Sequence, residues 1–298
     1  MGQIISATEV PEPIMVEEGA ERERLRQRVP GLRVESPDRT LERLQNVPVL
    51  AFDTETTGLL RHQDSVVYWS LSDGENRWCL PRHSLYRFAG LLSDPTRALV
   101  GQTVNYDRWM VLNSGIDLMD PSDSRWRTRY RTWDVATMHT LHSDNQPHGL
   151  KSICANLPEP IRMGSFRETF ASPEKDVGAK LRTFYADDPM TVIKYASLDA
   201  WGTFKAWEHL TDRLERAEDK HGGNLLDYYL RFEQPMHDIL WQMEREGVLF
   251  DSEAAVAKIH TLEEEMHQLR KAIFRAVGRV VNVNSTKQLI PLFYDQDE

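Results

Sequence analysis

The feature that most restricts the fold of this chain is a short apolar run that ends in acidic residues. Pro48-Val-Leu-Ala-Phe52 leads directly into Asp53-Thr-Glu55. A compact apolar run bounded by charge predicts a buried β-strand. Side chains alternate along a strand, so Asp53 and Glu55 face the same way. The sequence therefore predicts a strand that brings two carboxylates to one point.

The rest of the chain predicts strands early and helices late. Further strands are expected at 65–72, 77–80 and 98–103, with Asp73-Gly74 as a hairpin turn. Helices are expected after Ser36-Pro37, near 85–92, and at 108–112, 189–217, 228–246 and 252–277. This order predicts an α/β or α+β domain.

Composition excludes several classes of protein. Lys and Arg number 36 against 46 Asp and Glu, so the net charge of −10 argues against a generally basic, DNA-coating protein. Two distant cysteines, Cys79 and Cys154, exclude a disulfide scaffold and fit a reducing compartment. The chain has no apolar run of membrane-spanning length, and residues 1–20 do not resemble a signal peptide. We expect a cytoplasmic, intracellular protein with no membrane partner.

Breaks in the pattern divide the chain into three expected parts. Residues 1–35 are polar and are expected to form a mobile extension. The α/β domain is expected at 36–220, and His221-Gly-Gly-Asn224 interrupts the helical pattern. Residues 221–298 are expected to be helical. The helix at 252–277 has one apolar face that is expected to pack against another element or a partner, formed by Val256, Ile259, Leu262, Met266, Leu269 and Ile273.

Paired carboxylates suggest a metal site. Asp53 and Glu55 would repel each other unless one is protonated or a cation lies between them. Oxygen ligands favour Mg²⁺ or Mn²⁺. The structural alternative is a polar strand end that enters a loop.

Two more acidic motifs follow. Asp107 lies where a strand gives way to a helix, and it is either a site residue or a helix cap. Tyr195 and Asp199 are four residues apart on one helix, so they share a face. They are either part of a site or a surface pair.

These motifs together resemble the proofreading 3′–5′ exonuclease of family A DNA polymerases, in the tyrosine subclass of the DEDD exonucleases. The matching sequence motifs are LAFDTETTGL (50–59), GQTVNYD (101–107), HGLKSI (148–153) and YASLDAWGTFKAW (195–207). Two later motifs resemble the start of the polymerase thumb in this family, FEQPMHDILWQMEREGVLFD (232–251) and VNVNSTKQLIPLFYDQ (281–296).

The resemblance implies a ribonuclease H-like domain, with a mixed sheet flanked by helices, followed by a helical thumb-entry segment. It implies two divalent metal ions, with Asp53 bridging them, Glu55 and Asp199 completing one, and Asp107 serving the second. Tyr195 would orient the attacking water. The product would be a 5′-mononucleotide removed from the 3′ end of DNA.

The resemblance also suggests nucleic-acid contacts. The family usually has an asparagine four residues before the second aspartate, whereas this chain has Thr103 there and Asn105 two residues later. Thr56 and Tyr106 are further candidates beside the carboxylates.

The stretch 124–133 alternates arginines with aromatic residues. Arg127 and Arg129 could pair with phosphates while the aromatic rings stack on bases. The alternative is a solvent-facing strand or loop.

A zinc site from His139, His142, His148 and Cys154 is a weaker alternative, because their spacing fits no standard pattern.

We expect a 3′–5′ exodeoxyribonuclease that acts in DNA replication on a single-stranded or frayed 3′ end. Its polymerase domain would lie in cis or in a separate chain, in a bacterium or in a virus-infected host cell. Polymerase activity is not expected from this chain alone, and the stripe on 252–277 would dock a polymerase partner or else the helix at 228–246. The competing functions are an RNA 3′ exonuclease like ribonuclease D, and a non-catalytic nucleic-acid-binding scaffold.

Overall fold

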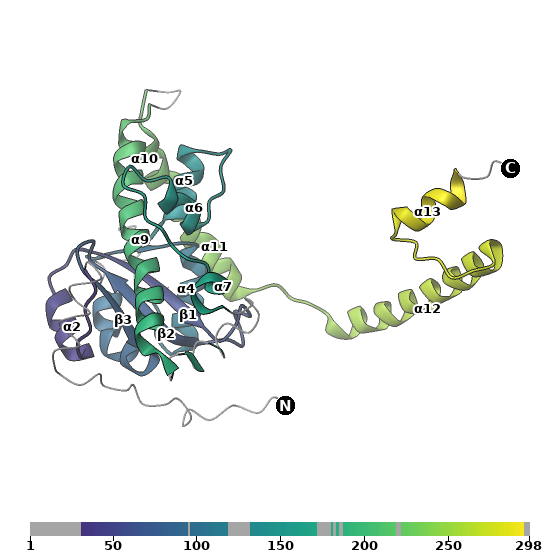
Figure 1. Cartoon of the computed structure of the whole chain (residues 1–298), viewed down its shortest axis with the longest axis horizontal. Coiled ribbons are helices and arrows are strands. Elements are labelled where there is room, and N and C mark those ends of the chain that lie inside the picture. Colours follow the sequence, from purple (N-terminus) through teal and green to yellow (C-terminus); the bar gives the residue numbers. More distant parts are fainter. Residues whose placement is uncertain are drawn as a thin grey trace. The chain divides into compact units, whose positions relative to one another are not determined.

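The computed structural model describes residues 31–94, 96–118, 132–171, 180, 183–184, 187–218 and 222–294. The chain forms two compact units, of which the first ends at Gln242 and the second begins at Met243. The ribbon is shown in Figure 1.

A five-stranded mixed sheet forms the centre of the first unit, in the order β3-β2-β1-β4-β5. Its strands are β1 (Val49–Thr56), β2 (Val66–Ser72), β3 (Arg77–Pro81), β4 (Ala98–Gly101) and β5 (Thr132–Asp134). β1 is antiparallel to β2 and parallel to β4, β2 is antiparallel to β3, and β4 is parallel to β5. The predicted mixed sheet is therefore present, with β1 at its centre.

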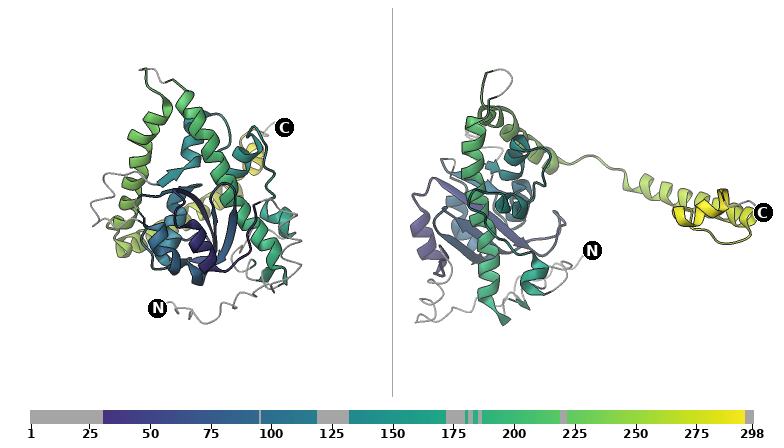
Figure 2. Two further views of the ribbon diagram at one scale, coloured as in Figure 1. Left: turned by 90° about the vertical axis from the view of Figure 1, so that its left-hand side faces the viewer. Right: turned by 45° about the horizontal axis from the view of Figure 1, so that its top comes forward.

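Helices cover both faces of this sheet, as two further views show (Figure 2). One face packs against α2 (Pro37–Leu44), the 3-10 helix η1 (Arg82–Phe88), α3 (Ala89–Leu92) and α4 (Val104–Asn113). The other packs against α5 (Val135–His142), α6 (Leu150–Ala155) and α9 (Pro189–Arg216). Leu50 and Phe52 belong to the first core and Ala51 to the second, as strand alternation requires.

Two helices begin at the caps that the sequence predicts. The Ser36 hydroxyl accepts a hydrogen bond from Arg39 N, with Pro37 in the first turn of α2. The Asp188 carboxylate accepts from Thr191 N before Pro189, at the start of α9. Both caps satisfy backbone N–H groups that would otherwise lack a partner.

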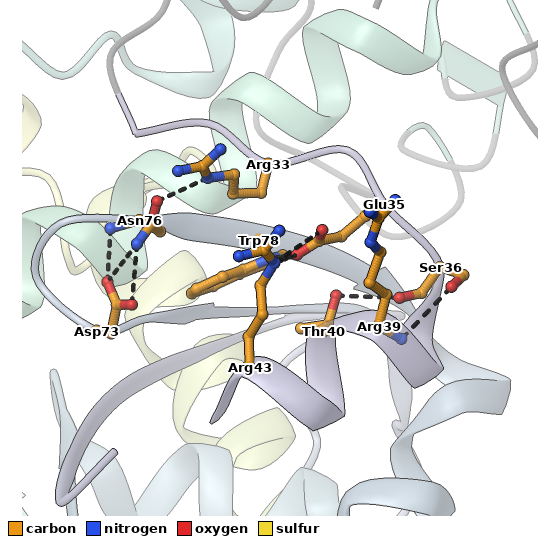
Figure 3. Close-up of polar contacts among 9 residues, drawn as sticks. All are labelled: Arg33, Glu35, Ser36, Arg39, Thr40, Arg43, Asp73, Asn76 and Trp78. Atoms are coloured by element: carbon orange, nitrogen blue, oxygen red, sulfur yellow. Dashed lines mark hydrogen bonds and ion pairs between the residues drawn. The ribbon is translucent and has the colours of Figure 1, made fainter. Parts of the chain in front are cut away.

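The segment before α2 lies along the edge strand β3. Leu32 forms a parallel bridge with Arg77, and Arg33 Nε donates to Asn76 Oδ1 at 2.7 Å. Trp78 Nε1 donates to Glu35 Oε1 at 2.8 Å, as Figure 3 shows. Ordered structure therefore begins before Ser36, where the sequence placed its start, because these residues pair with β3; residues 1–30 lie outside the described residues.

Several elements differ from the sequence prediction, and the helices α5 and α6 were not predicted. β5 was not predicted, because a strand of three residues has too little pattern to recognise. α4 begins at Val104 rather than at Arg108, and the preceding Thr103 has a left-handed backbone with φ 56°. The helix expected at 228–246 is divided into α10 (Leu225–Tyr228), the π-helical turn η3 (Tyr229–Glu233) and α11 (Gln234–Glu246).

The second unit contains α12 (Ser252–Val277), with the predicted bounds, and α13 (Thr286–Phe293). No residue of either helix is buried. The break between the units at Gln242 lies later than the functional boundary expected at 220, and the division into exonuclease and thumb stays a prediction. Within the described parts of the chain, no helix has the length and apolarity needed to cross a membrane.

Candidate active site

The central strand presents Asp53 and Glu55 on the face of the sheet that α9 covers. β1 continues through both residues, which lie opposite Ser70 and Tyr68 of β2. The register shifts directly after Glu55, so the regular ladder ends at the acidic pair. Thr54 lies between them and points to the opposite face.

α9 brings Asp199 to the same place. Val192, Ala196 and Ala200 on this helix are fully buried, which fixes the face that it presents to the sheet. One carboxylate oxygen from each of Asp53, Glu55 and Asp199 lies within 4.8 Å of the others. Two distant segments of sequence thus contribute to a single acidic cluster.

Asp107 approaches β1 from the α4 side and is 3% exposed. Its Oδ1 accepts hydrogen bonds from Thr54 N at 3.0 Å and from Thr54 Oγ1 at 2.6 Å. It is therefore anchored to the residue between Asp53 and Glu55. It is not the N-cap of α4, because this helix begins at Val104 with Thr103 as its N-cap and Asp107 lies inside the first turn. The N–H group of Val104 donates to Asp134 Oδ2 at 2.7 Å.

Burial of these carboxyl groups opposes their ionisation. Desolvation raises the pKa of Asp53 to about 6. Desolvation and then the charge of Asp53 raise the pKa of Asp199 to about 8. The pKa values of Glu55 and Asp107 are also raised, mainly by burial and then by neighbouring carboxylates. Such a cluster binds protons or a cation more readily than isolated carboxylates do.

The donor set fits a hard divalent cation. All three converging side chains offer carboxylate oxygens, the ligand type that Mg²⁺ and Mn²⁺ prefer. No other group of three His, Cys, Asp or Glu side chains converges in this way among the described residues. The zinc alternative finds no such support, although His139 Nδ1 and His148 Nδ1 lie 2.8 Å apart.

Tyr195 is one turn before Asp199 on α9 and packs among aromatic rings. Its ring lies 5.3 Å from that of Phe170 and 6.2 Å from that of Phe166, both on α7 (Phe166–Phe170). These edge-on contacts hold the tyrosine beside the acidic cluster.

Lys151 is a residue of the site to which the sequence argument gave no role. Its Nζ lies 5.7 Å from the centre of the Tyr195 ring. Its positive charge lowers the pKa values of Glu55 and Asp199, in opposition to the larger effect of burial. The sequence could have pointed to Lys151, because this residue belongs to the motif HGLKSI (148–153), one of the motifs that carry the family resemblance.

The other predicted contacts have varied surroundings. Thr56 Oγ1 and Tyr106 Oη lie 2.7 Å apart, and Tyr106 Oη donates to Gly58 O at 2.7 Å, so both residues brace the loop after β1. Thr103 forms the turn before α4, and Asn105 Nδ2 donates to His237 O at 3.1 Å. Their contacts with nucleic acid stay predictions.

The arginine-rich stretch lies largely outside the described residues, including Arg127 and Arg129. Trp133 at its end is described, and it stacks on Tyr229 with ring centres 5.5 Å apart. Trp207 meets it edge-on at 5.7 Å. Trp133 is half-buried and packs against rings of its own chain, and stacking of bases on this stretch stays a prediction.

A comparison with protein-family models shows to which family this chain belongs. A family model described as 3′-5′ exonuclease matches residues 34–215, which is more than half of the chain. The chain belongs to this 3′-5′ exonuclease family of the family A DNA polymerases. The matched span includes every residue of the acidic cluster, together with Asp107, Lys151 and Tyr195.

Curated relatives agree with this assignment. DNA polymerase I of Pseudomonas aeruginosa is 27% identical over 276 residues, covering 87% of this chain and 28% of that protein. DNA polymerase I of Synechocystis is 29% identical over 196 residues, covering 65% of this chain and 18% of that protein. The chain thus spans about a quarter of the length of such relatives.

Solved structures show the same fold. The POL domain of Pol1 from M. smegmatis, in complex with DNA primer-template and dNTP, has a TM-score of 0.62 at 14% identity, covering 90% of this chain and 41% of that one. Brucella melitensis NrnC has a TM-score of 0.50 at 19% identity, covering 71% of this chain and 94% of that one. The first unit therefore has the predicted ribonuclease H-like α/β fold.

Proposed function

We propose that the chain is a 3′–5′ exodeoxyribonuclease that removes 5′-mononucleotides from the 3′ end of DNA and proofreads for a family A polymerase. The observation that carries this proposal is the convergence of Asp53, Glu55 and Asp199 within 4.8 Å. Carboxylates this close, with raised pKa values, favour a bound divalent cation over a structural role.

Within this proposal the carboxylates hold two divalent cations. Asp53, Glu55 and Asp199 would hold one, and Asp107 together with Asp53 would hold the other. A pair of bound cations stabilises the attacking and the leaving oxygen of an in-line displacement at phosphorus.

The remaining residues act on water and substrate. Tyr195 would orient the attacking water through its hydroxyl group. The ammonium group of Lys151 supplies positive charge beside an acidic cluster and would contact the phosphate of the terminal nucleotide. Thr56, Thr103, Asn105 and Tyr106 remain candidates for contact with the DNA strand, as do Arg127 and Arg129.

The proposed partner is a polymerase domain, in the same polypeptide or in a separate chain. The curated relatives are DNA polymerase I proteins, which supports DNA as substrate and a role in replication. We propose an intracellular, DNA-associated location, in a bacterium or in a cell that hosts a virus.

The test uses the full chain with 3′-labelled single-stranded DNA and an RNA of the same sequence. With Mg²⁺ we expect stepwise shortening of the DNA and release of 5′-mononucleotides, and a chelator should stop it. Asp53→Ala should lower the single-turnover rate by about a thousandfold, a loss of roughly 4 kcal/mol of transition-state stabilisation. Asp144→Ala, which removes an exposed carboxylate, is the matched control.

The proposal fails if the wild-type chain leaves DNA intact in Mg²⁺ and Mn²⁺, or if Asp53→Ala keeps full activity. Shortening of RNA with intact DNA would identify an RNA 3′ exonuclease instead. Binding of DNA without hydrolysis would identify a scaffold.

A further inference from the structure

Helix α11 packs against α4, the helix that carries Asp107. Arg108, the next residue, points toward α11, where its Nη1 lies 3.0 Å from Asp238 Oδ1. The two side chains are 1% and 9% exposed. The guanidinium carbon also lies 4.3 Å from the centre of the Trp241 ring. A buried ion pair with an aromatic cover joins the two helices.

Further contacts fix the first turn of α4 to the same helix. Asn105 Nδ2 donates to His237 O at 3.1 Å, and Arg108 Nη1 donates to Asn105 Oδ1 at 3.0 Å. Trp109 and Trp241 have ring centres 6.1 Å apart. Asn105, Arg108 and Trp109, which flank Asp107 in the sequence, therefore all contribute to the contact between α4 and α11.

A second connection reaches the beginning of α4. Asp134 N donates to Tyr229 Oη at 2.8 Å, and Asp134 Oδ2 accepts from Val104 N at 2.7 Å. Gln234 Nε2 donates to Thr132 O at 2.8 Å. The π-helical turn η3 and the start of α11 therefore hold β5, whose last residue, Asp134, accepts a hydrogen bond from the first residue of α4.

These contacts add to the packing of Val104, Met110 and Val111 of α4 in the core of the sheet, and they act on the turn of the helix that carries Asp107. The helix spans only Val104–Asn113, and Thr103 before it has φ 56°, a conformation that favours glycine. β1 pairs with β4 only from Val49 to Ala51. Beyond that point the Thr54 N–H has Asp107 as its acceptor, so the position of Asp107 depends on how α4 is held.

We propose that Asp238 is a positioning residue of the exonuclease site, acting through Arg108 to hold α4 so that Asp107 stays bonded to Thr54 beside Asp53 and Glu55. This inference rests on the proposed function for its catalytic consequence, but its structural part can be measured without activity. It also extends the functional exonuclease unit beyond residue 220, to the end of the first unit at Gln242.

The experiment compares the wild-type full chain with Asp238→Ala and measures amide hydrogen exchange in the metal-free protein. The Thr54 amide should exchange at least about tenfold faster in the variant, while amides of the β2–β3 ladder keep their rates. Asp227→Ala, an exposed acid-to-alanine change in the same segment, should leave Thr54 unchanged.

Kinetics give the second readout. In Asp238→Ala we expect kcat for DNA to fall about tenfold with KM unchanged, and the Mg²⁺ concentration for half-maximal activity to rise. Asp238→Asn keeps the size of the side chain and removes its charge; it should show the same changes to a smaller degree. It replaces Asp238→Ala if that variant does not fold.

Unchanged exchange at Thr54 would overturn the proposal, and so would equal acceleration of all amides, which would indicate a general loss of stability. If the wild-type chain does not hydrolyse DNA, the proposed function fails. The exchange of Thr54 would still decide whether Asp238 positions Asp107.

Discussion

The raised pKa values of the acidic cluster have a definite effect on stability. A carboxyl group whose pKa is higher in the folded than in the unfolded chain stabilises the fold fully below the unfolded pKa, near 4. That contribution is lost as pH rises through the folded values, about 6 for Asp53 and about 8 for Asp199. His139, His142 and His209 have pKa values lowered by burial, which gives the opposite trend. A test of the carboxylate effect must therefore compare variants that differ only at a carboxylate, so that the contribution of the histidines cancels.

We predict that Asp53→Asn stabilises the metal-free protein increasingly as pH rises from 5 to 8. The change from 3.8 to about 6 corresponds to about 3 kcal/mol at most. Urea unfolding of both proteins in chelator measures the difference in free energy of unfolding. Mg²⁺ should stabilise the wild type more at pH 8 than at pH 5. A difference that is constant with pH would contradict the effect of burial.

Tyr195 should matter less than the carboxylates. Tyr195→Phe keeps the ring among Phe166 and Phe170 and removes only the hydroxyl group. We expect the single-turnover rate to fall about tenfold to a hundredfold. A loss as large as that of Asp53→Ala would mean that the hydroxyl does more than orient water.

At the scale of elements, the hairpin between β2 and β3 helps to seat α9. Gly74 has φ 92° at the turn, and its carbonyl oxygen accepts from Trp201 Nε1 at 3.1 Å. A Cβ at this position would lie 2.4 Å from a carbon of the Phe204 ring. The turn thus requires glycine for its backbone and for its contact with α9, which carries Asp199.

Gly74→Ala should destabilise the protein by about 2 kcal/mol or more, because strain and overpacking act together. Gly90 is a matched control, since a Cβ there meets nothing within 4 Å and the residue lies in α3. Gly90→Ala should be neutral or stabilising by about 0.5–1 kcal/mol. Thermal or urea unfolding gives both values; equal effects of the two substitutions would refute the contact.

At the scale of the whole molecule, the chain between α11 and α12 presents large apolar residues to solvent. Val248, Leu249 and Phe250 are 90%, 105% and 71% exposed. They follow the end of the first unit at Gln242. Such a segment is a preferred site of proteolysis.

Limited chymotrypsin digestion should therefore cut after Leu249 or Phe250. We expect mass spectrometry to identify a stable product that contains the first unit, with the exonuclease activity retained. Replacing both residues by serine should slow this cut and leave the others unchanged. Rapid degradation of the first unit instead would show that it needs the second.

The sequence suggests that the apolar stripe on α12 is a docking face, and this role stays a prediction. Val256, Ile259 and Leu269 are 52%, 52% and 63% exposed in the structure. Hydrogen exchange of α12 with and without a polymerase domain tests it. Strong protection in the chain alone would favour a self-contained fold.

The amino-acid sequence alone predicts the central strand, the shared direction of Asp53 and Glu55, the caps of α2 and α9, and the bounds of α12. These features follow from local rules, since alternation, capping and helical periodicity involve neighbours in sequence. Family likeness added Asp107, Tyr195 and Asp199 to the expected site.

What those residues contact depends on how distant segments pack together. The hydrogen bonds from Thr54 to Asp107, the place of Lys151 beside Tyr195, and the ion pair of Arg108 with Asp238 join segments 44 to 130 residues apart. The short strand β5 and the stacking of Trp133 on Tyr229 likewise depend on partners elsewhere in the chain. Such contacts arise from how elements pack, and no local pattern of residues encodes them.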